Sequence, residues 1–150
     1  MSSGSNKITK EVITQIRTLQ YENDQLQLQL SAIEQQLTLI SRAIDSLNDA
    51  INTQQELKNT TPGDEILVPI GGSNLILCTV KDPGTAFISI GSGISHQITQ
   101  DLSEEKNRNQ VSNLEQSVKQ LQNNYVQLAQ TLEGRRQELT QLTQKYQIVT

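Results

Sequence analysis

The sequence predicts a mainly α-helical fold with a small β region: a long antiparallel coiled-coil hairpin with two central β-hairpins that join an oligomeric β-barrel. Three observations lead to this prediction. Heptad patterns run along both halves of the chain, residues 70–94 combine glycine turns with short apolar runs, and only 34 % of residues are apolar. Globular domains usually have roughly 45–50 % on a count that includes Gly. The apolar residues must therefore lie in narrow stripes or in the central segment.

These patterns divide the 150 residues into four parts. We expect a flexible N-terminus over residues 1–6 and a coiled-coil helix over residues 7–58. Two β-hairpins for oligomerisation follow over residues 62–100, and a second coiled-coil helix occupies residues 101–149.

The first helix is predicted from apolar residues at alternating steps of four and three, with no Pro or Gly between them. A spacing of 3.5 residues requires a partner helix wound left-handedly around the stripe. Eleven of the twelve positions are aliphatic, and Thr61-Pro62-Gly63 ends the helix. The positions are Val12, Ile16, Leu19, Asn23, Leu26, Leu30, Ile33, Leu37, Ile40, Ile44, Leu47 and Ile51.

The second helix has the same spacing, and we expect Asp101 to be its N-cap, with Glu104 completing a capping box. Its stripe comprises Val111, Leu114, Val118, Leu121, Tyr125, Leu128, Leu132, Arg135, Leu139, Leu142, Tyr146 and Val149.

The two stripes match each other when residues whose numbers sum to 158 are paired antiparallel. Apolar positions then oppose apolar positions, and the two polar ones, Asn23 and Arg135, fall opposite each other, which avoids two separate buried polar defects. The alternative is that each helix pairs in parallel with another chain. The shared polar layer favours the intrachain hairpin.

Four strands are predicted in the centre: 66–70, 75–80, 85–90 and 94–99. The connectors, such as Gly71-Gly72-Ser73-Asn74 and Gly91-Ser92-Gly93, have turn composition and hairpin length. Several strands alternate in a way that leaves both faces apolar, and small sheets of this kind are marginal alone and prone to pair with other chains. The candidate oligomerisation residues are Ile66, Val68, Ile70, Leu75, Leu77, Val80, Phe87, Ile88 and Ile90.

This layout resembles an α-class prefoldin subunit of the archaeal type over nearly the whole chain. The most specific parts are Leu67-Val68-Pro69-Ile70-Gly71 and Ile90-Gly91-Ser92-Gly93. Two hairpins rather than one indicate the α class. The resemblance implies a hexamer of two α-class and four β-class subunits, with six coiled-coil arms on a double β-barrel. It also implies an ATP-independent chaperone, or holdase, whose arm tips capture unfolded proteins and deliver them to a group II chaperonin.

The arm tips are the candidate client-binding site. In the hairpin register both ends of the chain bring apolar residues together there, and we expect two helices to leave part of their own stripe uncovered at a free end. The alternative is that these residues only complete the coiled coil. The candidate residues are Ile8, Val12, Ile13, Ile16, Leu139, Leu142, Tyr146, Ile148 and Val149.

Other classes of function are not expected. The sequence has no nucleophile–base constellation, so we predict no enzyme, no cofactor and no metal; His96 has no ligand cluster around it, and Cys78 is expected in an apolar core. The net charge of −4 and the absence of a basic cluster argue against nucleic acid. No apolar run is long enough to span a membrane, and the polar start has no signal core, so a cytoplasmic location is expected.

A second function class stays open. A structural scaffold or fibre protein could use the same coiled-coil spacers and assemble through its β region. Such a protein would assemble from one chain alone, whereas the chaperone would need a β-class partner and open arm tips.

Overall fold

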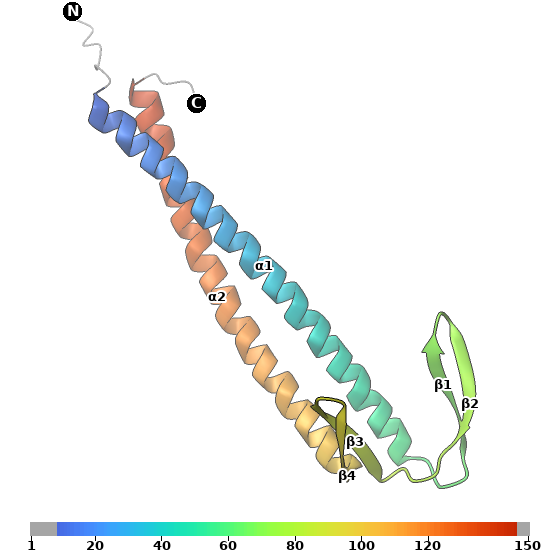
Figure 1. The fold of residues 1–150 in the computed structure, drawn as a ribbon. Helices are drawn as coiled ribbons and strands as arrows, with labels where there is room; N and C mark the ends of the chain where they lie inside the picture. Colours follow the sequence, from blue (N-terminus) through green and yellow to red (C-terminus); the bar gives the residue numbers. More distant parts are fainter. Residues whose placement is uncertain (1–8, 147–150) are drawn as a thin grey trace, which may run out of the picture. The chain divides into compact units, whose positions relative to one another are not determined.

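The computed structural model describes residues 9–146. Two long helices flank four short strands, in the order α1 (Lys10–Lys58), β1 (Glu65–Gly71), β2 (Asn74–Thr79), β3 (Thr85–Gly91), β4 (Ile94–Thr99) and α2 (Gln100–Tyr146) (Figure 1). The described residues form two units. We call residues 9–39 with 117–146 the arm unit and residues 40–116 the hairpin unit.

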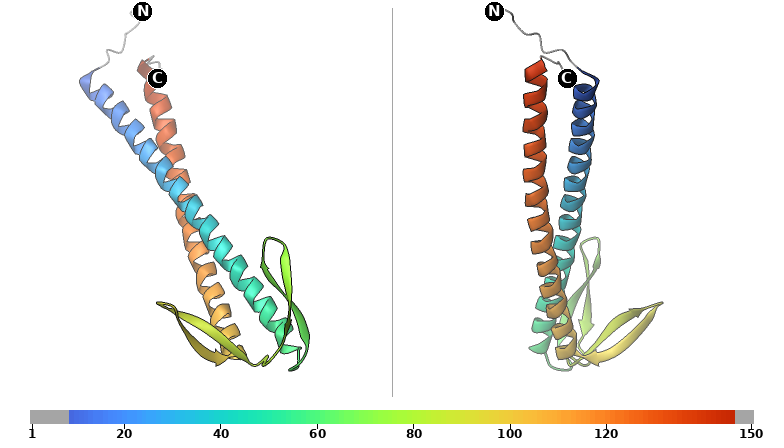
Figure 2. Two further views of the ribbon diagram at one scale, coloured as in Figure 1. Left: turned by 45° about the vertical axis from the view of Figure 1, so that its right-hand side comes forward. Right: turned by 90° about the vertical axis from the view of Figure 1, so that its left-hand side faces the viewer.

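In the arm unit, α1 and α2 run antiparallel and side by side, as both views in Figure 2 show. The hydroxyl of Tyr125 donates to the carboxylate of Glu34 at 2.8 Å, and Arg135 lies 3.4 Å from Glu22. The residue numbers of each pair sum to within one of the predicted 158. The antiparallel pairing of the two helices is therefore confirmed, and buried stripe residues form its core: Val12, Ile16, Leu19, Leu30 and Leu132.

Helix α1 begins and ends at local signals. The hydroxyl of Thr9 accepts a hydrogen bond from the backbone N–H of Val12 at 3.4 Å, as an N-cap does. The helix ends at Lys58, just before the predicted Pro-Gly, and Gly63 takes a φ of 100°, which favours glycine.

The predicted cap of α2 is wrong. The helix begins at Gln100, and the hydroxyl of Thr99, the last residue of β4, accepts from the N–H of Leu102 at 3.2 Å. Asp101 instead pairs with Lys58 at 2.7 Å, and Glu104 also bonds to Lys58. A lysine from the other helix attracts both carboxylates, so the hydroxyl two residues earlier takes the capping position.

Each hairpin is a separate two-stranded antiparallel sheet, β1 with β2 and β3 with β4. The strand bounds differ from the predicted ones by no more than one residue at each end. Both turns have two central residues with positive φ, Gly72-Ser73 and Ser92-Gly93, which is the type I′ pattern that matches strand twist. Gly71 and Gly91 precede the turns with φ near 100°, and the register shifts there as in a β-bulge.

The two hairpins are copies of one design at an offset of twenty residues. The strand bounds, the register, the bulges and the turns repeat at this offset. The backbone hydrogen bond at the open end of each hairpin repeats as well. Val80 N donates to Asp64 O in the first hairpin and Gln100 N donates to Gly84 O in the second, each at 2.8 Å. The repeat is hard to find in the sequence alone, since little more than Ile-Gly and a terminal Thr is shared between the copies.

Candidate binding and assembly surfaces

The first hairpin has two apolar faces. Its register pairs Leu67 with Leu77 and Pro69 with Leu75 on one face, and places Ile66, Val68, Ile76 and Cys78 on the other. The three leucines are 57–63 % exposed, whereas Ile66, Val68 and Cys78 are half-buried. A sheet with exposed apolar side chains on one face and half-buried ones on the other is typical of a surface where proteins interact.

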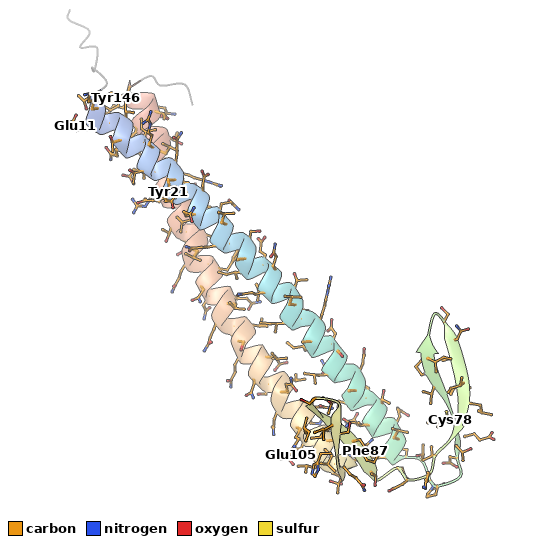
Figure 3. All side chains as sticks on the ribbon, viewed as in Figure 1. Glu11, Tyr21, Cys78, Phe87, Glu105 and Tyr146 are labelled. Carbon is orange, nitrogen blue, oxygen red and sulfur yellow. The ribbon has the colours of Figure 1, made fainter. Side chains whose placement is uncertain are left out.

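The second hairpin has only one apolar face. Its register places Ala86, Ile88 and Ile98 together with His96. The opposite face is polar apart from Phe87, which is 68 % exposed (Figure 3). Because the two hairpins repeat, the face common to both is the one containing Ile88 in the second hairpin and Val68 in the first.

The predicted oligomerisation residues differ in exposure. Five are exposed, namely Ile70, Leu75, Leu77, Phe87 and Ile90, and three are half-buried, namely Ile66, Val68 and Ile88. Val80 is buried, and its backbone forms hydrogen bonds with Gly63 and Asp64, each at 2.8 Å. Leu67, Ile76 and Ile94 are exposed as well but were not predicted, although they alternate with residues that were.

Both small sheets also have open edges. Within residues 9–146 each strand has a single neighbour, so the outer edges of both hairpins have unpaired backbone groups. The connector between the hairpins is fixed locally, since the carboxylate of Asp82 accepts from the N–H of Gly84 at 2.9 Å and from the hydroxyl of Thr85. Those two donors, the hydroxyl foremost, lower the pKa of Asp82.

A buried polar cluster joins the two helices in the hairpin unit. Gln54 donates to the hydroxyl of Ser103 at 2.7 Å and accepts from Asn107 at 3.2 Å, while Glu104 binds Lys58 and Arg108. Gln54, Ser103 and Glu104 are all buried. Because buried polar groups cost free energy unless they are paired, this cluster favours a single register of the helices. The predicted apolar stripes end at Ile51 and begin again at Val111, so they did not include these polar positions.

The charges in this cluster shift each other's protonation. Lys58, and then Arg108, lower the pKa of Glu104 to about 2. Asp101, and then Glu104, raise the pKa of Lys58. The cluster stays charged at neutral pH, and it has an evident structural role at the junction between helices and hairpins.

The predicted polar layer in the arm unit is only partly formed. Arg135 pairs with Glu22 and Glu138, both at 3.4 Å, and not with Asn23. The side-chain oxygen of Asn23 is buried and accepts no hydrogen bond within the described residues. The shared layer therefore does not avoid a buried polar defect at Asn23, because the guanidinium binds carboxylates in preference to a neutral amide.

The end of the arm unit is better covered than we expected. Val12 and Ile16 are buried at 9 % and 7 % exposure, so the α1 side of the stripe is covered, whereas the α2 side stays partly uncovered. The off-stripe Ile13 is exposed at 41 %. Leu139, Leu142 and Tyr146 are half-buried, and Tyr146 and Glu11 lie at the same end of the unit (Figure 3). Ile8, Ile148 and Val149 lie outside the described residues.

A groove lies beside this end of the arm unit. It has a volume of about 580 Å³ and is lined by α1 from Lys10 to Glu22 and by Arg135 and Glu138 of α2. Its walls combine both signs of charge with threonine and glutamine side chains and Leu19. Such a lining offers hydrogen-bonding groups to a peptide backbone and no arrangement specific to one small molecule.

Residues 9–146 contain no group of three or more His, Cys, Asp or Glu placed to hold a metal ion. His96 is exposed, and Cys78 is half-buried rather than enclosed in a core. In the same part of the chain, neither helix is apolar enough over a sufficient length to cross a membrane.

Comparison with known proteins agrees with this geometry. The family model for the prefoldin subunit matches residues 26–145. Prefoldin subunit alpha of Methanosarcina acetivorans is 29 % identical over 140 residues, covering 91 % of this chain and 89 % of that protein. The corresponding subunit of Methanosarcina mazei is 26 % identical over 127 residues, covering 83 % and 89 %. The structure of a filamentous PFD from Methanocaldococcus jannaschii has the same fold, with a TM-score of 0.68, 18 % identity, and coverage of 79 % of this chain and 98 % of that one.

Proposed function

This chain belongs to the prefoldin family, and on that basis we propose that it is an α-class subunit of an ATP-independent holdase that acts in the cytoplasm. Family membership indicates a chaperone subunit in general. In our proposal the assembled protein captures unfolded proteins at its arm tips and delivers them to a group II chaperonin.

The observation that carries the proposal is the exposed apolar surface of both hairpins. Two-stranded sheets with open edges and exposed Leu67, Leu77 and Phe87 are marginal alone and are stabilised by strands from other subunits. We propose that four β-class subunits and two copies of this chain complete the sheets as a double barrel. The apolar face common to both hairpins, with Val68 and Ile88, faces the barrel interior in this arrangement.

Client capture in this proposal begins at the exposed Ile13 and the half-buried Leu142 and Tyr146. The buried Val12 and Ile16 become available only when the helix ends open locally, which costs little free energy at a terminus. Burial of apolar surface contributes about 25 cal/mol per Å², so one tip binds weakly. Several tips acting on one client chain raise the effective affinity. Leu139, Ile8, Ile148 and Val149 complete the proposed site.

A second candidate is a self-assembled scaffold or fibre. It is favoured by one observation, namely that the similar structure is a filament. The same exposed hairpins would then bind hairpins of further copies of this chain. The two candidates differ in whether a β-class subunit is required.

The test has two parts. The mass of the chain, measured by light scattering alone and after co-expression with a β-class subunit, should become that of a hexamer only in the co-expressed sample. Removing residues 1–13 and 143–150 should leave this hexamer intact and abolish its suppression of aggregation of a denatured test protein, without ATP. Val126→Gln, which changes an exposed apolar residue away from the tips, is the matched control and should keep full protection.

The outcomes separate the candidates. A large homopolymer formed by the chain alone would favour the scaffold. An intact truncated hexamer with full protection would contradict tip capture while leaving the assembly proposal in place.

A further inference from the structure

The side of α1 that faces away from α2 in the arm unit has an apolar stripe that no other described residue of this unit covers. Tyr21, Leu28 and Leu39 are 63–65 % exposed, and Ala32 is exposed as well. At 100° per residue these four positions lie within about 20° of one line along the helix. We call residues 21, 25, 28, 32, 35 and 39 the outer stripe.

The outer stripe has the spacing of a second coiled-coil seam. Its six positions alternate in steps of four and three, and four are apolar while the other two are Gln25 and Gln35. They occupy the c and f positions of the heptad whose a and d positions pack on α2. Because this spacing matches the 3.5-residue period of a supercoiled helix and not the two-residue period of an extended chain, the fitting partner is another helix.

The outer stripe is also complementary to itself. When two copies are placed antiparallel so that paired residue numbers sum to 60, Tyr21 meets Leu39, Gln25 meets Gln35, and Leu28 meets Ala32. Large side chains then oppose smaller ones, and the two polar positions oppose each other. A twofold axis passes near residue 30, as an isologous contact requires.

The flanking residues add no repulsion in this arrangement. These residues lie beside the stripe, so their paired numbers sum to 58 or 62 instead of 60. Glu22 of one copy lies across from Gln36 of the other, and Asp24 lies across from Thr38. At the centre, Gln29 faces its own copy. No like charges meet along the predicted contact, so charge repulsion does not oppose it.

We propose that the outer stripe is a homotypic docking surface, at which α1 of a second copy of this chain packs antiparallel against α1. Three large side chains per copy cover much less than the roughly 1,200–2,000 Å² of a stable interface. The contact is therefore weak and concentration-dependent. Because the paired arms point in opposite directions, it joins arms of two separate assemblies.

Disulfide formation between mixed variants tests both the contact and its direction. In a Cys78→Ala background, whose mass is first checked for intact assembly, the only cysteines are those introduced. Protein with Gln25→Cys, mixed with protein with Gln35→Cys, should form an interchain disulfide under mild oxidation. Neither variant should crosslink appreciably with itself. Self-crosslinking of each variant without mixed crosslinks would indicate parallel packing and overturn the proposal.

A second measurement uses the protein with Cys78 intact. Sedimentation velocity of the assembled protein should show association that increases with concentration, and Leu28→Gln should reduce the associated fraction at least several-fold. Val126→Gln, which removes an exposed apolar side chain from α2, should leave the fraction unchanged. If Leu28→Gln instead lowers client protection and leaves self-association unchanged, the stripe binds clients and the proposal is wrong.

Discussion

Leu28 and Leu30 lie only two residues apart on α1, but one is exposed and the other buried. Truncating each to alanine should show which of the two faces of α1 packs on α2 and which faces outward. Leu30 is 5 % exposed and Leu28 is 63 % exposed on the same helix. Leu→Ala at a buried site costs about 2–5 kcal/mol. A two-helix interface relaxes more easily than a globular core, so we expect about 2–3 kcal/mol for Leu30→Ala. Leu28→Ala should change stability by less than about 0.5 kcal/mol.

Amide hydrogen exchange of the assembled protein, at matched concentration, is the appropriate assay because it reports local opening of α1. Each 1.4 kcal/mol corresponds to a factor of ten in the opening equilibrium, so exchange around residue 30 should accelerate roughly 30- to 150-fold in Leu30→Ala. In Leu28→Ala the acceleration should stay within about two- to threefold.

The comparison can refute the assignment of the two faces. Equal acceleration in both variants would mean that Leu28 is covered to the same extent as Leu30 in the assembled protein. A larger effect at Leu28 would mean that the a and d positions do not form the interface between α1 and α2.

Two further predictions concern the hairpin unit. The pKa of Glu104 is lowered from 4.5 to about 2, so its stabilising contribution is present above about pH 4.5 and is lost as the pH falls toward 2. Thermal melts of Glu104→Gln should therefore show a deficit against the unmodified protein at pH 7 that shrinks toward pH 2; a constant deficit would mean that the carboxylate charge is unimportant. Ile88→Asp should abolish assembly in light-scattering mass measurements, because it places an unpaired charge on the shared apolar face, while Ser95→Asp on the polar face should not. Loss of assembly in both variants would contradict the assignment of the faces.

The element order and most element bounds follow from local sequence signals. The heptad spacing predicts both helices, because a stripe at 3.5 residues has favourable burial only against another helix. Pro62-Gly63 ends α1 within the predicted region, and the glycine-rich turns fix the hairpins, because positive φ angles at Gly72 and Gly93 suit residues without a Cβ. These signals act over a few residues, so they can be interpreted without knowing the partner surfaces.

The candidate sites were predicted less completely. The hairpin residues were found by alternation, but alternation alone does not say which face a partner covers. The twenty-residue repeat and the strand register identify the apolar face that both hairpins share, since the second hairpin has only one apolar face. At the end of the arm unit, the many apolar residues predicted that several of them would be exposed to solvent. In the structure, packing of α1 on α2 buries Val12 and Ile16, and Ile13 stays exposed.

The sequence by itself determined the helices, the hairpins and the antiparallel partnership of the two stripes, because each depends on periodicity that is encoded locally. Only the tertiary structure decided where the charged and polar groups are paired. Lys58 draws Asp101 and Glu104 away from the helix cap, and Arg135 binds Glu22 in place of Asn23. These pairings join residues more than forty positions apart, and their energy depends on distance and burial, which the order of residues along the chain does not specify.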